Sequence, residues 1–240
     1  MFLTPQEIIK KEPTINGRLF SEYGGATLQK YTVGPSELTN FSFFGQNRTT
    51  FEQLKTTFGP RTLTLEVKFA ARDLHTATLQ KSLFDGQLFG KNEIWLPDGF
   101  FYTVSTASLG DAAIEADTTD GVLIGAEYSF KGFRHGPMQT ISIPPGGSRI
   151  KCLSTMPFTD CVYTVRVARA VGQYNLGGAV FKNVKANESL VFDGIKKKIL
   201  RNGVENAAEV SWLNFPQLAA GFNQIPASYT TTIQYYPTYI

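Results

Sequence analysis

The run Leu190-Val-Phe-Asp-Gly-Ile-Lys-Lys-Lys-Ile-Leu-Arg-Asn-Gly203 decides the fold class of this chain. Two turn dipeptides, Asp193-Gly194 and Asn202-Gly203, bracket residues 195–200, and a segment of that length is predicted to be a short strand. Asp-Gly and Asn-Gly supply the positive φ angles of tight hairpin turns. The end of the chain is therefore predicted to be a meander of antiparallel strands.

The composition agrees with a folded, mainly β protein. Aromatic residues make up 13% of the chain, with 19 Phe and 10 Tyr, and such side chains suit the half-buried face of a sheet. The net charge of +3 is too small to indicate nucleic-acid specificity. Residues 1–136 hold 13 basic and 15 acidic side chains, whereas residues 137–240 hold 10 and 5. A basic second half could face an acidic partner, although a solvated surface is favoured.

No targeting segment or membrane span is predicted. The N-terminus lacks a basic segment followed by an apolar one, and no apolar run approaches the roughly 20 residues that a membrane span needs. Two cysteines, Cys152 and Cys161, do not make a disulfide framework. They could lie across a hairpin, but buried free thiols are favoured because the cytosol keeps cysteines reduced.

The first half of the chain holds the clearest strand patterns. Residues 61–69 alternate strictly between apolar and polar, which predicts a strand with one buried face. Residues 94–104 read as a hairpin whose turn is Pro97-Asp98-Gly99. Residues 122–130 show the same alternation of apolar residues with the rest, which predicts another strand. Residues 36–60, rich in Thr, Ser, Asn and Phe, are predicted to be a long loop, and long loops of this kind are usually functional or interfacial.

One substantial helix is predicted at about 71–85. Apolar residues recur there at nearly helical spacing, at Ala71, Leu74, Leu79, Leu83 and Phe84. Asp73 suits the positive end of the helix dipole, and Asp85-Gly86 supplies the stop.

A domain boundary is predicted near His135-Gly136-Pro137, giving domains 1–136 and 137–240. After it, only short strands are expected, at 138–143, 148–154, 161–170, 179–184, 189–193, 195–200, 207–213 and 229–236. Eight strands at this spacing predict a β-sandwich or jelly roll.

No residue pattern predicts catalysis, a metal or a cofactor. The two histidines, His75 and His135, have no partner at metal-ligand spacing, and no G-x-S-x-G elbow marks a nucleophile. Four carboxylates cluster at Asp111, Glu115, Asp117 and Asp120, but a solvated loop or interface rim is favoured over a glycosidase pair. Lysines 196–198 are interpreted as guards of an edge strand. Trp95 and Trp212 are assigned to packing rather than to sugar stacking.

The order of these pieces resembles the distal tail proteins of siphophages. The C-terminal stretch carries the most weight, and its motif residues are Asp193, Gly194, Asn202, Gly203, Phe215, Pro216, Leu218, Gly221 and Asn223. The elements of the first half follow in the family's order, from Thr14-Ile-Asn-Gly17 through Phe44-Gly-Gln-Asn-Arg48 to the hairpin at Leu96-Pro-Asp-Gly-Phe-Phe-Tyr102.

The resemblance implies an N-terminal β-sandwich with one helix and a hairpin, followed by a galectin-like β-sandwich. It implies a non-enzymatic adaptor whose homohexameric ring joins the tail tube protein to the baseplate hub or tail-associated lysin, and to a receptor-binding protein. Such a protein belongs to the virion, at the tail tip, and is assembled in the bacterial cytoplasm. The residues expected at the ring contact are Phe41, Phe43, Phe44, Arg48, Phe51 and Arg61.

Two other functions stay open at this point. Galectin-like sandwiches are also a lectin architecture, so a carbohydrate-binding module for cell-wall glycans is the alternative, although fold analogy alone is weak support. A cell-wall hydrolase that uses the carboxylates at 111–120 is the third.

Overall fold

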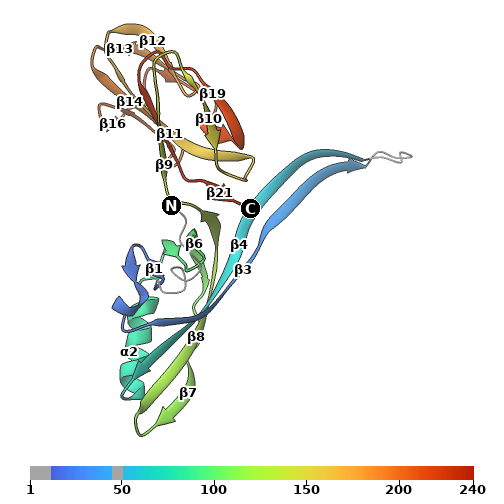
Figure 1. The fold of residues 1–240 in the computed structure, drawn as a ribbon, viewed down its shortest axis with the longest axis vertical. Helices are drawn as coiled ribbons and strands as arrows, with labels where there is room; N and C mark the ends of the chain where they lie inside the picture. Colours follow the sequence, from blue (N-terminus) through green and yellow to red (C-terminus); the bar gives the residue numbers. More distant parts are fainter. Residues whose placement is uncertain (1–11, 45–50) are drawn as a thin grey trace. The chain divides into compact units, whose positions relative to one another are not determined.

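The computed structural model describes residues 12–44 and 51–240, which form two compact units (Figure 1). Unit 1 runs to His135 and includes Ile240, and unit 2 is Gly136–Tyr239. Each unit has its own hydrophobic core. Strands dominate both, and the described residues contain one α-helix. The prediction of a mainly β chain with two domains is confirmed.

Unit 1 is built on one antiparallel sheet with the strand order β2-β1-β5-β6-β8-β4-β3, and β7 also pairs with β8. Its elements are β1 (Thr14–Ile15), β2 (Arg18–Leu19), the 3-10 helix η1 (Phe20–Glu22), β3 (Thr27–Phe44), β4 (Phe51–Ala71), α2 (Leu74–Asp85), β5 (Lys91–Trp95), β6 (Phe101–Ser108), β7 (Ala113–Thr118) and β8 (Gly121–His135). The strand predicted at 61–69 is part of β4, and its apolar face is buried. The predicted hairpin joins β5 to β6, where Gly99 takes a φ of +85°.

Strands β3 and β4 extend beyond the rest of the sheet as a two-stranded arm (Figure 1). Strand β8 pairs with β4 only from Arg61 to Ala71, so residues 51–60 pair with β3 alone. We call residues 36–44 and 51–60 the arm. The prediction of a long loop at 36–60 is therefore wrong for the described residues. Thr and Phe favour extended backbone, but register shifts, such as that between Val33 and Ser36, break the alternation that marks a strand.

Helix α2 packs on the sheet by a different face from the predicted one. It begins after Asp73, whose Oδ1 accepts a hydrogen bond from the Thr76 amide at 2.8 Å, so the predicted start at 71 is too early. Its buried residues are Ala77, Lys81 and Phe84, whereas Leu74, Leu79 and Leu83 are exposed. The apolar spacing located the helix, but of the apolar residues it used within α2 only Phe84 is buried, and the three leucines are exposed.

Aromatic contacts and one internal ion pair hold α2 in this orientation. The fully buried Phe84 ring lies 5.3 Å from Phe20, 5.7 Å from Phe69 and 5.2 Å from Tyr128, measured between ring centroids. Lys81 takes a buried position because its Nζ lies 2.7 Å from Asp85 Oδ2. The Tyr128 hydroxyl donates to Asp85 Oδ1 at 2.7 Å. A buried lysine paired in this way costs far less than an unpaired one.

Unit 2 packs small antiparallel sheets around one core. Strands β16-β15-β14-β11-β20-β9 form the main sheet, with β18 also on β11, while β12-β13-β17 and β10-β19 form two smaller sheets. The strands are β9 (Gln139–Ile143), β10 (Ser148–Cys152), β11 (Phe158–Val167), β12 (Val171–Leu176), β13 (Ala179–Val184), β14 (Glu188–Asp193), β15 (Lys198–Arg201), β16 (Val204–Glu205), β17 (Val210–Ser211), β18 (Gln217–Ala219), β19 (Gly221–Ile225), β20 (Thr231–Tyr235) and β21 (Thr238–Tyr239).

The segment 190–203, from which the meander was predicted, folds as expected only at its C-terminal end. Asn202 and Gly203 take φ angles of 50° and 79°, as a tight hairpin turn requires. At the other end, residues 194–197 form a turn and the strand starts at Lys198, so the strand predicted at 195–200 is wrong at its start. The positive φ there belongs to Lys197, at 56°, because Asp193 Oδ1 accepts hydrogen bonds from two amides of the turn.

Candidate assembly interface

No group of three His, Cys, Asp or Glu side chains within 12–44 and 51–240 is placed to hold a metal ion. Over the same residues, no helix is long and apolar enough to cross a membrane. His135 ends β8 rather than lying in a linker, and its Nε2 is 3.0 Å from Thr103 Oγ1 while its ring stacks on Phe101.

The acidic stretch at 111–120 is partly strand rather than loop. Residues 113–118 form β7 along β8, and the carboxylate of Glu115 forms a 2.6 Å ion pair with Lys68. That carboxylate is tied to a structural partner, and the bond raises the pKa of Lys68. A glycosidase would need two carboxylates free to act on the substrate, and Glu115 is instead engaged by Lys68.

The arm carries four of the six residues expected at the ring contact. Phe41 lies on the outer part of the arm and is 51% exposed. Leu38, on the same strand, is 56% exposed. Phe43, Phe44 and Phe51 lie on the same strands. Arg48 lies outside the described residues.

Arg61 has a different place, at the base of the arm. Its Nη1 donates a hydrogen bond to the Gly34 carbonyl at 3.0 Å, which joins β4 to β3 where the arm leaves the sheet. Its burial and the nearby Arg134 guanidinium lower the pKa of Arg61. Arg61 therefore supports the root of the arm, whereas Leu38 and Phe41 offer apolar surface.

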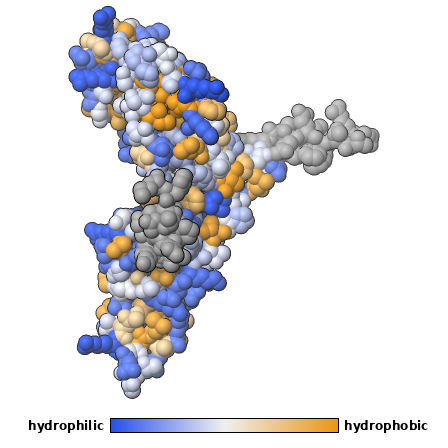
Figure 2. Space-filling model, viewed as in Figure 1, coloured by the Kyte–Doolittle hydropathy of each residue, from blue (hydrophilic) through white to orange (hydrophobic). Residues whose placement is uncertain are grey.

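A second apolar surface lies on α2 and was missed by sequence reasoning. Leu74, Leu79 and Leu83 are 44%, 52% and 60% exposed. Figure 2 shows apolar surface over this part of unit 1 and along the base of the arm. The sequence did contain a signal for the buried face, because positions 77, 81 and 84 also have helical spacing. The residue at the middle of these positions is a lysine, which does not suggest burial.

The C-terminal motif residues support turns in unit 2. Pro216 O accepts a hydrogen bond from the Cys161 amide at 3.2 Å, and a Cβ on Gly194 would lie 2.5 Å from that same Pro216 oxygen. The Asn223 side chain bonds the Ala219 amide at 2.9 Å and the Ala219 carbonyl at 2.8 Å, closing the β18–β19 turn, where Gly221 takes a φ of +83°. Leu218 is buried in the core.

The fold resembles that of a solved phage protein over nearly the whole chain. In particular, it is similar to the crystal structure of the SPP1 Dit protein (gp 19.1), with a TM-score of 0.73 and 9% identity over 96% of this chain and 100% of that one. Two structures of the phage P2 baseplate in its activated conformation, with Ca and with Sr, match at TM-scores of 0.47 and 0.45, with 7% and 8% identity over 88% of this chain and 90% of theirs. No family model and no curated protein matches the sequence. The predicted resemblance to distal tail proteins is confirmed at the level of the fold.

Proposed function

We propose that this chain is a structural protein of a phage tail and that its work is contact rather than catalysis. The observation that carries the proposal is the match to SPP1 Dit, which extends over both units and leaves no part of that protein unmatched. SPP1 Dit is described as a paradigm of the hub adsorption apparatus in phages that infect Gram-positive bacteria. A match confined to one sandwich would support only a shared module.

The two apolar surfaces of unit 1 support a cyclic assembly. A closed ring sets one patch of each subunit against a different patch of its neighbour. The arm and α2 lie on opposite sides of unit 1, as head-to-tail contact requires (Figure 1). A two-stranded ribbon is only marginally stable in water without further packing, so the arm gains from a neighbour. In this proposal the Leu38–Phe41 surface of one subunit meets the α2 leucines of the next, six times over.

The ring would act as an adaptor at the tail tip. It would cap the tail tube protein on one side and hold the baseplate hub or tail-associated lysin, with a receptor-binding protein, on the other. The galectin-like sandwich proposed for unit 2 would lie outside the ring. The basic second half of the chain would steer acidic partners during assembly in the host cytoplasm.

Light scattering of the purified chain, combined with two matched variants, tests the ring. The wild type is expected to have the mass of a hexamer, six times 26.5 kDa, or of two hexamers if two rings pair back to back. Leu38→Asp with Phe41→Asp places charges on the arm and is expected to give monomer. Leu213→Asp changes a side chain of unit 2 that is 91% exposed and should leave the ring intact. An arm variant that keeps the wild-type mass would contradict the proposed contact.

A further inference from the structure

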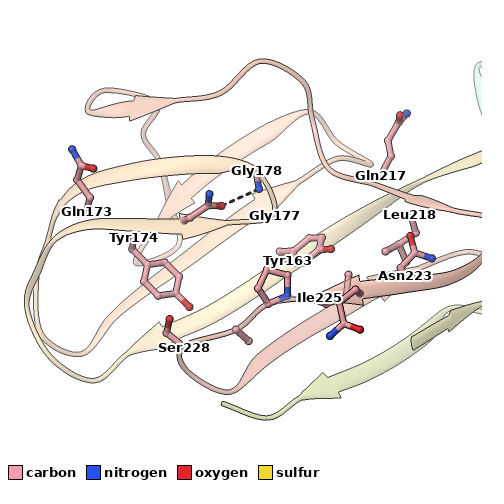
Figure 3. Close-up of a pocket in the computed structure, with 14 residues that line it drawn as sticks. Tyr163, Gln173, Tyr174, Gly177, Gly178, Gln217, Leu218, Asn223, Ile225 and Ser228 are labelled. Carbon is pink, nitrogen blue, oxygen red and sulfur yellow. Dashed lines mark hydrogen bonds between the residues drawn. The ribbon is translucent and has the colours of Figure 1, made fainter. Parts of the chain in front are cut away.

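Unit 2 contains a cavity that the adaptor role does not use. It encloses about 610 Å³, within the range of small-molecule sites in proteins. The turn that joins β12 to β13 forms one wall, and the segment from β18 to the start of β20 forms the other (Figure 3). The residues that line it come from one compact unit, so its walls do not depend on assembly.

The chemistry of the lining is uncharged and rich in hydrogen-bonding groups. None of the 14 lining residues is acidic or basic. Five are amides, two are tyrosines and one is serine, while Leu218 and Ile225 provide an apolar floor. An anion would find no cation here and a cation would find no carboxylate. A purely apolar ligand would leave the amides without partners, which is costly on burial.

Tyr163 presents an unused donor to this cavity. Its side chain is only 6% exposed, and its hydroxyl points toward the Leu218 side of the cavity (Figure 3). Within the described residues this hydroxyl makes no hydrogen bond to protein, so it is available to a ligand in the cavity. Burial raises the pKa of Tyr163, so the group stays a neutral donor.

The wall above Tyr163 is fixed before any ligand arrives. Gly177 lies directly over the Tyr163 ring, where an added Cβ would come within 2.9 Å of a ring carbon, and its φ is +60°. Asn175 Oδ1 accepts a hydrogen bond from the Gly178 amide at 3.2 Å, which holds the turn (Figure 3). A preformed wall lowers the entropy cost of binding.

We propose that this cavity binds a neutral sugar unit of a glycan. A sugar ring offers many hydroxyls to amides and to the Tyr163 hydroxyl, and its C–H faces suit the Leu218 and Ile225 floor. The proposal is independent of the ring, because it concerns unit 2 alone. It assigns the chain a recognition role in addition to its structural one.

A glycan array that carries uncharged oligosaccharides and anionic glycans side by side tests the class of ligand, with the full chain as the probe. Binding to uncharged oligosaccharides is expected. No retained glycan, or retention of anionic glycans only, would overturn the proposal.

Titration of the strongest uncharged oligosaccharide then tests the site. Tyr163→Phe removes a hydroxyl without breaking an internal hydrogen bond, and Gln224→Ala removes an exposed amide of the lining, so the double variant is expected to keep its melting temperature. It should bind at least about tenfold more weakly, which corresponds to about 1.4 kcal/mol. Tyr235→Phe, a control outside the lining, should bind like the wild type. Equal affinity of the wild type and the double variant, or an equal loss in the control, would place binding elsewhere.

Discussion

Replacing Phe84 with alanine is expected to destabilise unit 1 more than any single change on the outer face of α2. Phe84 is fully buried, and four aromatic rings surround it, with Tyr23 at 6.5 Å completing the set formed with Phe20, Phe69 and Tyr128. Truncating a buried Phe costs about 3 to 5 kcal/mol, because apolar contacts are lost and a cavity remains. For a unit of this size, the melting temperature should fall by about 8 °C or more.

Fluorescence can follow this change in unit 1 alone. Trp95 lies in unit 1 and Trp212 in unit 2, so a Trp212→Phe background leaves a single reporter on β5. Thermal unfolding of Phe84→Ala is compared in that background with Leu83→Ala, which truncates a side chain that is 60% exposed. The Leu83 variant should stay within about 0.5 kcal/mol of the parent.

Two outcomes would refute this account of α2. Equal losses in the two variants would mean that Leu83 is buried in the folded chain. A small loss for Phe84→Ala would mean that the helix does not pack by the 77, 81 and 84 face. The expected difference would instead show that the outer leucines are not needed for folding, which leaves them free for assembly.

Three further predictions concern charge and protonation. Arg201→Met leaves the Glu188 carboxylate without its partner, because the guanidinium bonds it at 2.7 Å and both side chains are less than 10% exposed. The free energy of unfolding should fall by about 3 kcal/mol near neutral pH. Lys198→Met, which breaks an exposed pair with Glu205, should lower it by less than about 1 kcal/mol. Because Arg201 lowers the pKa of Glu188 from 4.5, the pair's contribution is present above that pH and should disappear as pH falls below it, in urea titrations at several pH values. Burial raises the pKa of the Cys161 thiol to about 12, so alkylation by iodoacetamide at pH 8 should require unfolding, and fast labelling of folded protein would contradict its burial. Burial and the bond to Asp85 raise the pKa of Tyr128 above 10.0, so wild-type stability should decline as pH rises past 10, and Tyr128→Phe should decline less steeply in the same titration.

Local sequence signals predicted the elements whose own side chains fix them. Strict alternation located the inner part of β4, and the Pro97-Asp98-Gly99 turn located the hairpin between β5 and β6. Strand β13 (Ala179–Val184) agrees with its predicted bounds at both ends. In each case the pattern is complete within a few residues, so no distant partner is needed to recognise it.

The features that were missed depend on partners far away in the sequence. Strand β12, with Gly172 and two polar residues of low strand propensity, Gln173 and Asn175, forms because β13 pairs along it. The burial of Lys81 depends on Tyr128, 47 positions later in the numbering, and on Asp85. The cavity beside Tyr163 requires the β12–β13 turn to lie over β11, and nothing within either segment predicts that approach. Of the expected ring-contact residues, the structure gives Phe41 an exposed place and Arg61 a supporting one.

Immunogold electron microscopy of phage particles tests the central claim most directly. Antibodies against the purified chain would be applied to intact particles of the phage that encodes it, with serum depleted on the same chain as the control. We expect gold at the end of the tail that is distal to the head, on most particles. Gold on the head or spread along the tail, or particles that contain none of the chain, would contradict the proposal that it is a tail-tip adaptor.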